Sequence, residues 1–234
     1  IQIYPAYLDQ MAQYFERVMR AKEEGKPMVG HCVLAPVELF YAMDIVPLHL
    51  ETFAPFLSFF EDLRPYLELA AAHGLRPEIC SAHRVTDAMV IDGAFPKPDF
   101  FVYTSQVCDN TPKSGESMAE MAGTPYYFLD RPYKYNERSL EYYTEEMADL
   151  VRFLEEQTGK KLDVDRLKEV LDSSYHLTHL CTELDELRKA VPTPMPCEGL
   201  FAEMALFWLL PGLPIANTLM EQLLSEMRQR VEQG

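Results

Sequence analysis

The sequence lacks the short motifs that identify several common classes of enzyme. It contains no CxxC pair, which argues against a zinc ribbon and a thioredoxin-like centre. It also contains neither a GxGxxG nor a GxxxxGK phosphate loop. Any chemistry that this chain performs therefore has to rest on residues outside these motifs.

A long uninterrupted apolar run is absent as well. The most apolar stretch, LFAEMALFWLLPGLP, contains Glu203 and is cut by Pro211, so it is too short and too interrupted to cross a bilayer. No segment has the pattern of a secretory signal peptide. The five cysteines are an odd number and do not resemble a disulfide framework. We therefore expect a cytoplasmic protein, not bound to a membrane, whose thiols are inert, catalytic or metal ligands.

Basic residues are scarce. The chain has 21 Lys and Arg against 37 Asp and Glu, a formal net charge of −16. A broad acidic field opposes binding of nucleic acid and of anionic membranes, although a helix N-terminus can still hold a small anion. The composition is otherwise that of a globular protein. The chain begins without Met and ends within a helical pattern, which is typical of a fragment of a longer polypeptide.

Four short apolar runs alternate with helical patterns in the first part of the chain. The runs cover residues 28–34, 44–51, 98–106 and 124–132; the helical patterns cover 8–19, 35–43, 55–73, a helix beginning at Cys80, and 114–123. Nearly continuous apolar strands that alternate with helices indicate a parallel sheet with helices on both faces. We predict a small Rossmann-like α/β domain over residues 1–133.

The remaining residues, 134–234, have a helical pattern throughout. Leucine spacing predicts helices near 140–154 and 167–180, the VPTPMP segment interrupts the pattern, and two more helices are expected near 197–210 and 214–231. We therefore predict that a helical segment follows the sheet domain.

Two cysteines stand where ligand sites form in such a fold. Cys80 opens a helix after a loop, and Cys108 follows the apolar strand that starts at Phe100. The carboxyl ends of parallel strands face the ligand crevice, and thiolates there can bind zinc or an iron–sulfur cluster. The spacing alone favours buried core cysteines, which are common.

Three further residues lie near the same expected edge. Glu51 ends the second apolar run, where a carboxylate could act as a general base or could simply be a solvated loop residue. His31 and Cys32 end the first run, where they could contact a substrate or pack in the core. His83, three residues after Cys80, has the same two interpretations.

The order of several segments resembles the 2-hydroxyacyl-CoA dehydratase family, which includes related subunits of ATP-dependent benzoyl-CoA reductase. The resemblance covers nearly the whole chain and rests on EEGKPMVGHCVLAPVELFYAMDIVPLHLE, EICSAHR, PDFFVYTSQVCDN, PYYFLDRPY and PTPMP, in that order.

The resemblance implies an oxygen-sensitive iron–sulfur enzyme made of two related subunits. Members hold a [4Fe-4S] cluster through three cysteines, two of which match Cys80 and Cys108. The third belongs to a second α/β domain, C-terminal to the helical segment and absent from this chain. The family also implies an acyl-CoA thioester substrate and a separate ATP-hydrolysing iron–sulfur activator, which would explain the missing phosphate loop.

The implied chemistry is a radical elimination of water from a 2-hydroxyacyl-CoA. One electron added to the thioester carbonyl gives a ketyl radical, which expels the 2-hydroxyl group and acidifies the proton on carbon 3. The family's catalytic glutamate matches Glu51, as proton acceptor or shuttle. A hydroxyl residue of the family falls at about Val33, whose side chain cannot donate a hydrogen bond. A benzoyl-CoA reductase-type subunit and a non-catalytic cluster-holding or scaffold subunit therefore remain as alternatives, and His31 or Cys32 could replace the missing hydroxyl.

Overall fold

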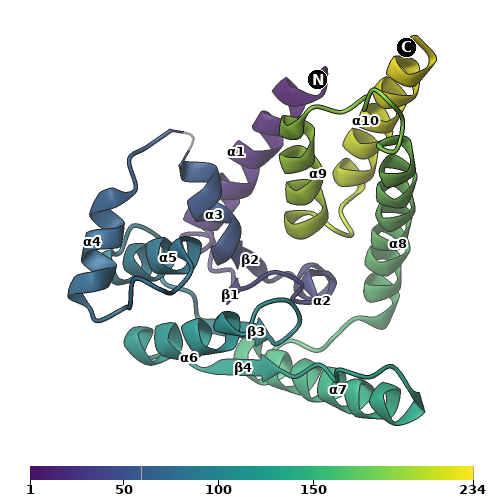
Figure 1. Cartoon of the computed structure of the whole chain (residues 1–234). Coiled ribbons are helices and arrows are strands. Elements are labelled where there is room, and N and C mark those ends of the chain that lie inside the picture. The colour runs from purple at the N-terminus through teal and green to yellow at the C-terminus, as the bar shows by residue number, and fades with distance from the viewer. Residues whose placement is uncertain (59, 234) are drawn as a thin grey trace. The chain divides into compact units, whose positions relative to one another are not determined.

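The computed structural model describes residues 1–58 and 60–233, and the chain divides into two compact units (Figure 1). One unit contains residues 18–36 and 43–162 and is called the sheet unit here. The other contains residues 1–17, 37–42 and the chain from residue 163 onward, and is called the helical unit.

The sheet unit is built on four parallel strands, which confirms the predicted α/β class. The strands are β1 (Met28–His31), β2 (Val46–His49), β3 (Phe100–Thr104) and β4 (Tyr126–Leu129), in the order β2-β1-β3-β4. After β1 the chain first adds β2 on one side and then returns to add β3 on the other. The carboxyl ends of β1 and β3 therefore form the switch point at which open parallel sheets bind ligands.

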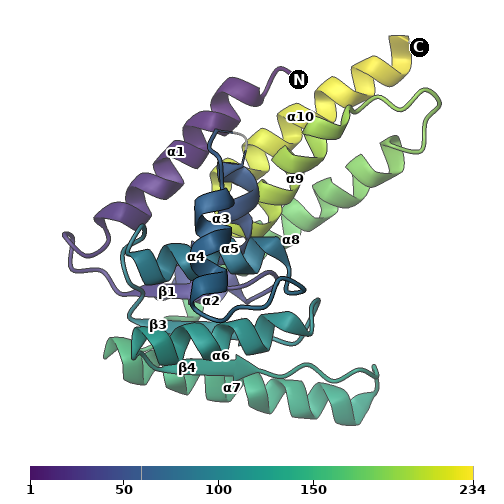
Figure 2. The same cartoon turned by 60° about the vertical axis from the view of Figure 1, so that its left-hand side comes forward.

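Helices cover both faces of this sheet. Tyr103 lies against Gly115 of α6 (Asn110–Ala122), and Phe100 makes an edge-on ring contact with Phe153 of α7 (Glu137–Thr158). Residues 100 and 103 point to opposite faces because side chains alternate along a strand. Figure 2 accordingly shows β4 between α6 and α7. The predicted division of the chain at residue 133 stays a prediction; α7, which follows that point, belongs to the sheet unit.

The single helix predicted over residues 55–73 is wrong. The structure has two helices, α3 (Leu50–Leu57) and α4 (Arg64–Ala72), with residues 60–63 outside both; residue 59 of the predicted span lies outside the described residues. A continuous helix would place Pro65 in its interior, where proline has no N–H to donate. The Asp62 carboxylate instead accepts from the backbone N–H of Arg64, and Pro65 stands in the first turn of a new helix.

The predicted strand end at Glu51 also requires correction. Strand β2 ends at His49, which is the N-cap of α3: its Nδ1 accepts from the Thr52 backbone N–H at 3.2 Å. The capping histidine allows the helix to begin directly after the strand. Glu51 therefore lies in the first turn of α3, and its side chain is fixed by a helix rather than by a loop.

The helices predicted in the second half of the chain are confirmed: α7 lies in the sheet unit, and the other three lie in the helical unit. The helical unit contains α2 (Val37–Ala42), α8 (Val164–Leu187), α9 (Cys197–Leu209), α10 (Pro214–Gln233) and most of α1 (Tyr4–Arg20). Asn217 of α10 donates to the Ser173 carbonyl of α8, and Arg188 pairs with Glu203 of α9. Within the described residues, no helix has the length and apolar character needed to span a membrane.

Candidate functional site

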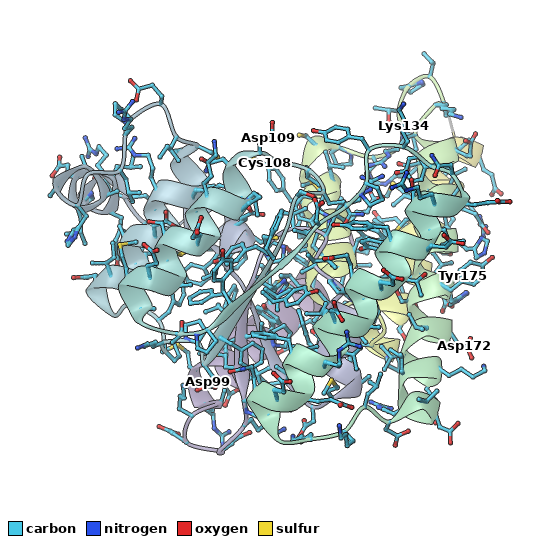
Figure 3. All side chains as sticks on the ribbon, turned by 90° about the horizontal axis from the view of Figure 1, so that it is seen from below. Asp99, Cys108, Asp109, Lys134, Asp172 and Tyr175 are labelled. Atoms are coloured by element: carbon cyan, nitrogen blue, oxygen red, sulfur yellow. The ribbon has the colours of Figure 1, made fainter. Side chains whose placement is uncertain are left out.

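The carboxyl edge of the sheet carries the predicted site residues. Asp99 precedes β3 and Cys108 follows it, and Figure 3 shows the two at opposite ends of the strands. Helix α5 (Ser81–Asp92) also belongs to this unit, and both α5 and α6 begin at this edge. Their first turns and that of α3 supply most of the polar side chains described below.

The Glu51 carboxylate is held by three polar partners at this edge. Its Oε2 accepts from the Val33 backbone N–H at 2.8 Å, and its Oε1 accepts from the Thr111 hydroxyl at 2.8 Å. His83 Nε2 lies 2.9 Å from the same Oε1. The donors come from the turn after β1, from α6 and from α5, so the Glu51 carboxylate contacts three separate segments of the sheet unit.

These contacts decide the charge of Glu51. Burial by itself raises the pKa of the carboxyl, because it penalises the ionised form. The hydrogen bond from His83, the Val33 N–H, the charge of His83 and the Thr111 hydroxyl together outweigh burial and lower the pKa of Glu51 to about 2. Glu51 is therefore ionised at every physiological pH.

The turn after β1, which contains the Val33 N–H, has an unusual backbone conformation. Leu34 has φ of 59°, in the left-handed region that a branched, non-glycine residue rarely adopts. The side chain of Cys32 stabilises the same turn through two hydrogen bonds: its Sγ donates to the Val33 carbonyl and accepts from the Thr104 N–H at 3.3 Å. The thiol thereby joins the ends of β1 and β3, and burial is the main cause that raises its pKa.

His31 lies inside the sheet unit together with His49. The two are register partners in the parallel pair, and their rings meet edge-on at 4.8 Å. Burial, and then the neighbouring His49, lowers the pKa of His31; burial lowers that of His49 to about 4. His31 and Cys32 are both completely buried, and their predicted contact with a substrate stays a prediction.

Cys80 and Cys108 are the accessible thiols of this edge. Cys80 is the exposed N-cap residue of α5, and its side chain makes no capping hydrogen bond. Cys108 is half-buried two residues before α6, and it interacts electrostatically with Cys32. Accessible thiols of this kind fit two of the ligands of an iron–sulfur cluster. The described residues contain no group of three or more His, Cys, Asp or Glu side chains able to hold a metal ion.

Several partners of Glu51 were not predicted from the sequence. His83 is open to two interpretations from the sequence alone, and neither Thr111 nor the Val33 N–H stands out in it. The spacing of His83 and Asp87, one helical turn apart on a helix that is otherwise largely buried, is a signal that could have indicated a polar face turned inward.

The four-stranded parallel sheet, with Glu51, Cys80 and Cys108 near its carboxyl edge, defines an open α/β domain, the class of fold in which ligands bind at this edge. The family described as 2-hydroxyglutaryl-CoA dehydratase, D-component, matches residues 32–234, and the chain belongs to this family.

Curated relatives are alpha subunits of acyl-CoA dehydratases. The chain is 26% identical to the (R)-phenyllactyl-CoA dehydratase alpha subunit of Clostridium sporogenes, over 92% of this chain and 55% of the relative. It is 22% identical to the (R)-2-hydroxyisocaproyl-CoA dehydratase alpha subunit of Clostridioides difficile, over 97% and 58%. It is 23% identical to the lactoyl-CoA dehydratase alpha subunit of Anaerotignum propionicum, over 92% and 56%. The chain thus spans a little more than half the length of these relatives.

Proposed function

We propose that this chain is part of a subunit of an iron–sulfur 2-hydroxyacyl-CoA dehydratase, a lyase that removes water from a 2-hydroxyacyl-CoA by radical elimination. The observation that carries the proposal is the ionised Glu51, held by three donors at the switch-point edge of the sheet, in a chain of this family. The carbon-3 proton of the substrate needs an acceptor, and Glu51 is a carboxylate at this edge that is deprotonated at neutral pH.

The donors around Glu51 also limit how strongly it can act as a base. A carboxylate with a pKa of about 2 is a weak proton acceptor near neutral pH. Its basicity rises when it loses a donor. A substrate whose thioester oxygen takes over the Val33 N–H would remove one, so that Glu51 becomes more basic when substrate is bound. The backbone of Val33 can thus supply the hydrogen bond that its side chain cannot.

Cys80 and Cys108 are proposed as two ligands of a [4Fe-4S] cluster. Bound there, the cluster would supply the electron that makes the carbon-3 proton removable, and an iron as Lewis acid. The protein residues would hold the cluster beside Glu51's edge and move the proton. His31 and Cys32, which are buried behind this edge, are the weaker proposals for substrate contact.

The partners follow from the same proposal. The relatives are named as alpha subunits, which implies a second, related subunit and an acyl-CoA substrate. An ATP-hydrolysing iron–sulfur activator, which the family resemblance implies, would deliver the electron and would explain why this sequence has no phosphate loop. Valine at position 33 favours one alternative, a subunit that holds a cluster or scaffolds its partner without dehydrating a substrate itself. A benzoyl-CoA reductase-type activity is the other alternative.

Iron content tests the proposed ligands. After anaerobic reconstitution of the full-length protein, Cys80→Ser and Cys108→Ser should each lower the bound iron and the visible thiolate-to-iron absorbance. Cys181→Ser is the matched control, because Cys181 lies within α8 of the helical unit and should leave both values unchanged. Full retention of iron in both ligand variants would contradict the proposal that a cluster binds at this edge.

A further inference from the structure

The segment that follows β4 combines exposed aromatic rings with basic side chains. Residues 131–138 contain three basic residues and one carboxylate, in a chain whose formal net charge is −16. Tyr133 and Tyr135 flank Lys134 in the sequence, and the two tyrosines are 95% and 82% exposed. Large aromatic rings usually bury their area in a core or against a partner. Neither the core nor the site described above uses these two rings.

Hydrogen bonds fix the start of this segment at the carboxyl edge of the sheet. The Ser105 hydroxyl, directly after β3, donates to the Asp130 carboxylate at 3.0 Å. The same hydroxyl accepts from the Arg131 backbone N–H at 3.0 Å. Figure 3 shows Lys134 at the same end of the strands as Cys108. The segment therefore lies at the edge that carries the proposed site.

The basic side chains of this segment have no acidic partner. Many other lysines and arginines of the chain form ion pairs. Among the residues that the structure describes, Arg131, Lys134 and Arg138 form none; the Arg131 guanidinium instead lies over the Tyr135 ring, 5.1 Å from its centroid. Both oxygens of the neighbouring Asp130 accept from hydroxyl groups. Three cations thus remain available to an anion.

The start of α7 adds to the positive charge of the segment. Arg138 stands in the first turn of this 22-residue helix, where the helix dipole favours anions and disfavours cations. Glu137, in the same turn, is the one carboxylate of residues 131–138. A polyanion that approaches an acidic protein needs such a local reversal of charge. The placement of Arg138 is therefore unfavourable for the helix and favourable for an anion site.

We propose that residues 131–138 bind the nucleotide part of coenzyme A: the adenine ring stacks on Tyr133, and Arg131, Lys134 and Arg138 pair with the phosphates. Exposed aromatic rings are platforms for bases, and cations form charge-assisted hydrogen bonds with phosphate oxygens. Tyr133 is the platform because Tyr135 already has a guanidinium over its ring. The inference rests on the proposed function for the identity of the ligand, and it names where the far half of the thioester is held.

The spacing of the strands fits the shape of coenzyme A. Strand β4 is two strands away from β1, and neighbouring strands lie about 4.8 Å apart, so the carboxyl ends of β1 and β4 are about 10 Å apart. The turn after β1 contains the Val33 N–H, the proposed donor to the thioester oxygen. The pantetheine arm, which joins the thioester to the phosphates, is long enough to cross this gap over the end of β3.

Anaerobic titration calorimetry of the full-length protein with its partner subunit tests the proposal, with coenzyme A as the probe. Tyr133→Ala should weaken binding roughly tenfold, because a stacking platform is lost. Lys134→Ala should weaken it about two- to fivefold, the range of an exposed ion pair, and added salt should reduce this difference. Adenosine 3′,5′-bisphosphate, the nucleotide part alone, should displace coenzyme A. Pantetheine, which lacks the nucleotide, should bind more weakly than coenzyme A.

Two matched variants control for the lost charge and the lost ring. Lys97→Ala removes an exposed cation that precedes β3, at the opposite end of the strands. Tyr175→Ala removes a tyrosine that is 67% exposed on α8 of the helical unit. Both variants should bind coenzyme A as wild type does.

Three results would overturn the proposal. The first is coenzyme A binding that is absent in wild type, or equal in wild type, Tyr133→Ala and Lys134→Ala. The second is bisphosphate that binds without displacing coenzyme A. The third is a Tyr133→Ala variant that loses the partner subunit but keeps full affinity, which would make the segment a subunit contact.

Activity separates this inference from the proposed function. If the variants bind coenzyme A more weakly but the wild-type complex dehydrates no thioester, the proposed function fails and the coenzyme A site stands. If the complex dehydrates a thioester while both variants bind coenzyme A as wild type does, only the site at residues 131–138 fails.

Discussion

At the scale of single residues, the interior of the sheet unit shows how environment separates two identical chemical groups. Glu51 is half-buried and Asp87 is completely buried, yet the pKa of Glu51 is about 2 and that of Asp87 about 7. The difference lies in the donors: a backbone N–H, a hydroxyl and an imidazole against one shared hydroxyl. Counting donors therefore assigns the charged state of each group.

The low pKa of Glu51 predicts a pH-dependent contribution to stability. A folded-state pKa below the unfolded value stabilises the fold above the unfolded pKa, and this stabilisation is lost as pH falls from 4.5 towards about 2. Glu51→Gln should lower the free energy of unfolding at pH 7 by up to about 3 kcal/mol, the equivalent of that shift.

Urea unfolding of wild type and Glu51→Gln at pH 7 and near the acid end of this window measures the effect. The difference between the two proteins should shrink as the pH falls, because wild-type Glu51 then becomes protonated in the unfolded chain. Thr111→Val, which removes one donor and leaves the charge in place, should cost less than Glu51→Gln at pH 7. A difference that is equal at both pH values would contradict the assigned shift.

At the scale of elements, the site depends on how closely α6 approaches β3. Gly115 of α6 lies against the Tyr103 ring, and a Cβ at that position would come within 2.2 Å of a ring carbon near its base. The ring is buried and cannot swing away. The same helix carries Thr111 and Ser114, the donors to Glu51 and Asp87, so that this glycine sets the distance at which both hydrogen bonds form.

Gly115→Ala should therefore destabilise the protein although alanine is the better helix former. Overpacking typically costs about 1–3 kcal/mol, against roughly 1 kcal/mol gained in helix propensity. Chemical denaturation should show a net loss, while Glu120→Ala at an exposed position of α6 should be neutral or slightly stabilising. An alanine variant as stable as wild type would show that α6 can move away from β3 at no cost.

At the scale of the whole molecule, the α/β class and nearly all elements could be predicted from apolar runs and helical spacing. The α3–α4 break was missed because the helical pattern continues across it, and only proline and a capping histidine mark the two starts. Glu51 could be singled out as a candidate, but its donors at positions 33, 83 and 111 could not. They meet because β1 ends, and α5 and α6 begin, at one edge of the sheet. The order of the strands in that sheet cannot be predicted from local apolar and helical patterns.

Turnover by the assembled enzyme tests the proposed role of Glu51 most directly. The full-length protein, its partner subunit and an activator would be supplied with phenyllactyl-, 2-hydroxyisocaproyl- and lactoyl-CoA, the thioesters named for the relatives. Product should form in catalytic excess over the reducing equivalents consumed. Glu51→Gln should lower kcat by about 10²–10⁴-fold with unchanged iron content. Activity of Glu51→Gln equal to wild type, or reductant consumed in proportion to product, would contradict the dehydratase role proposed for this site.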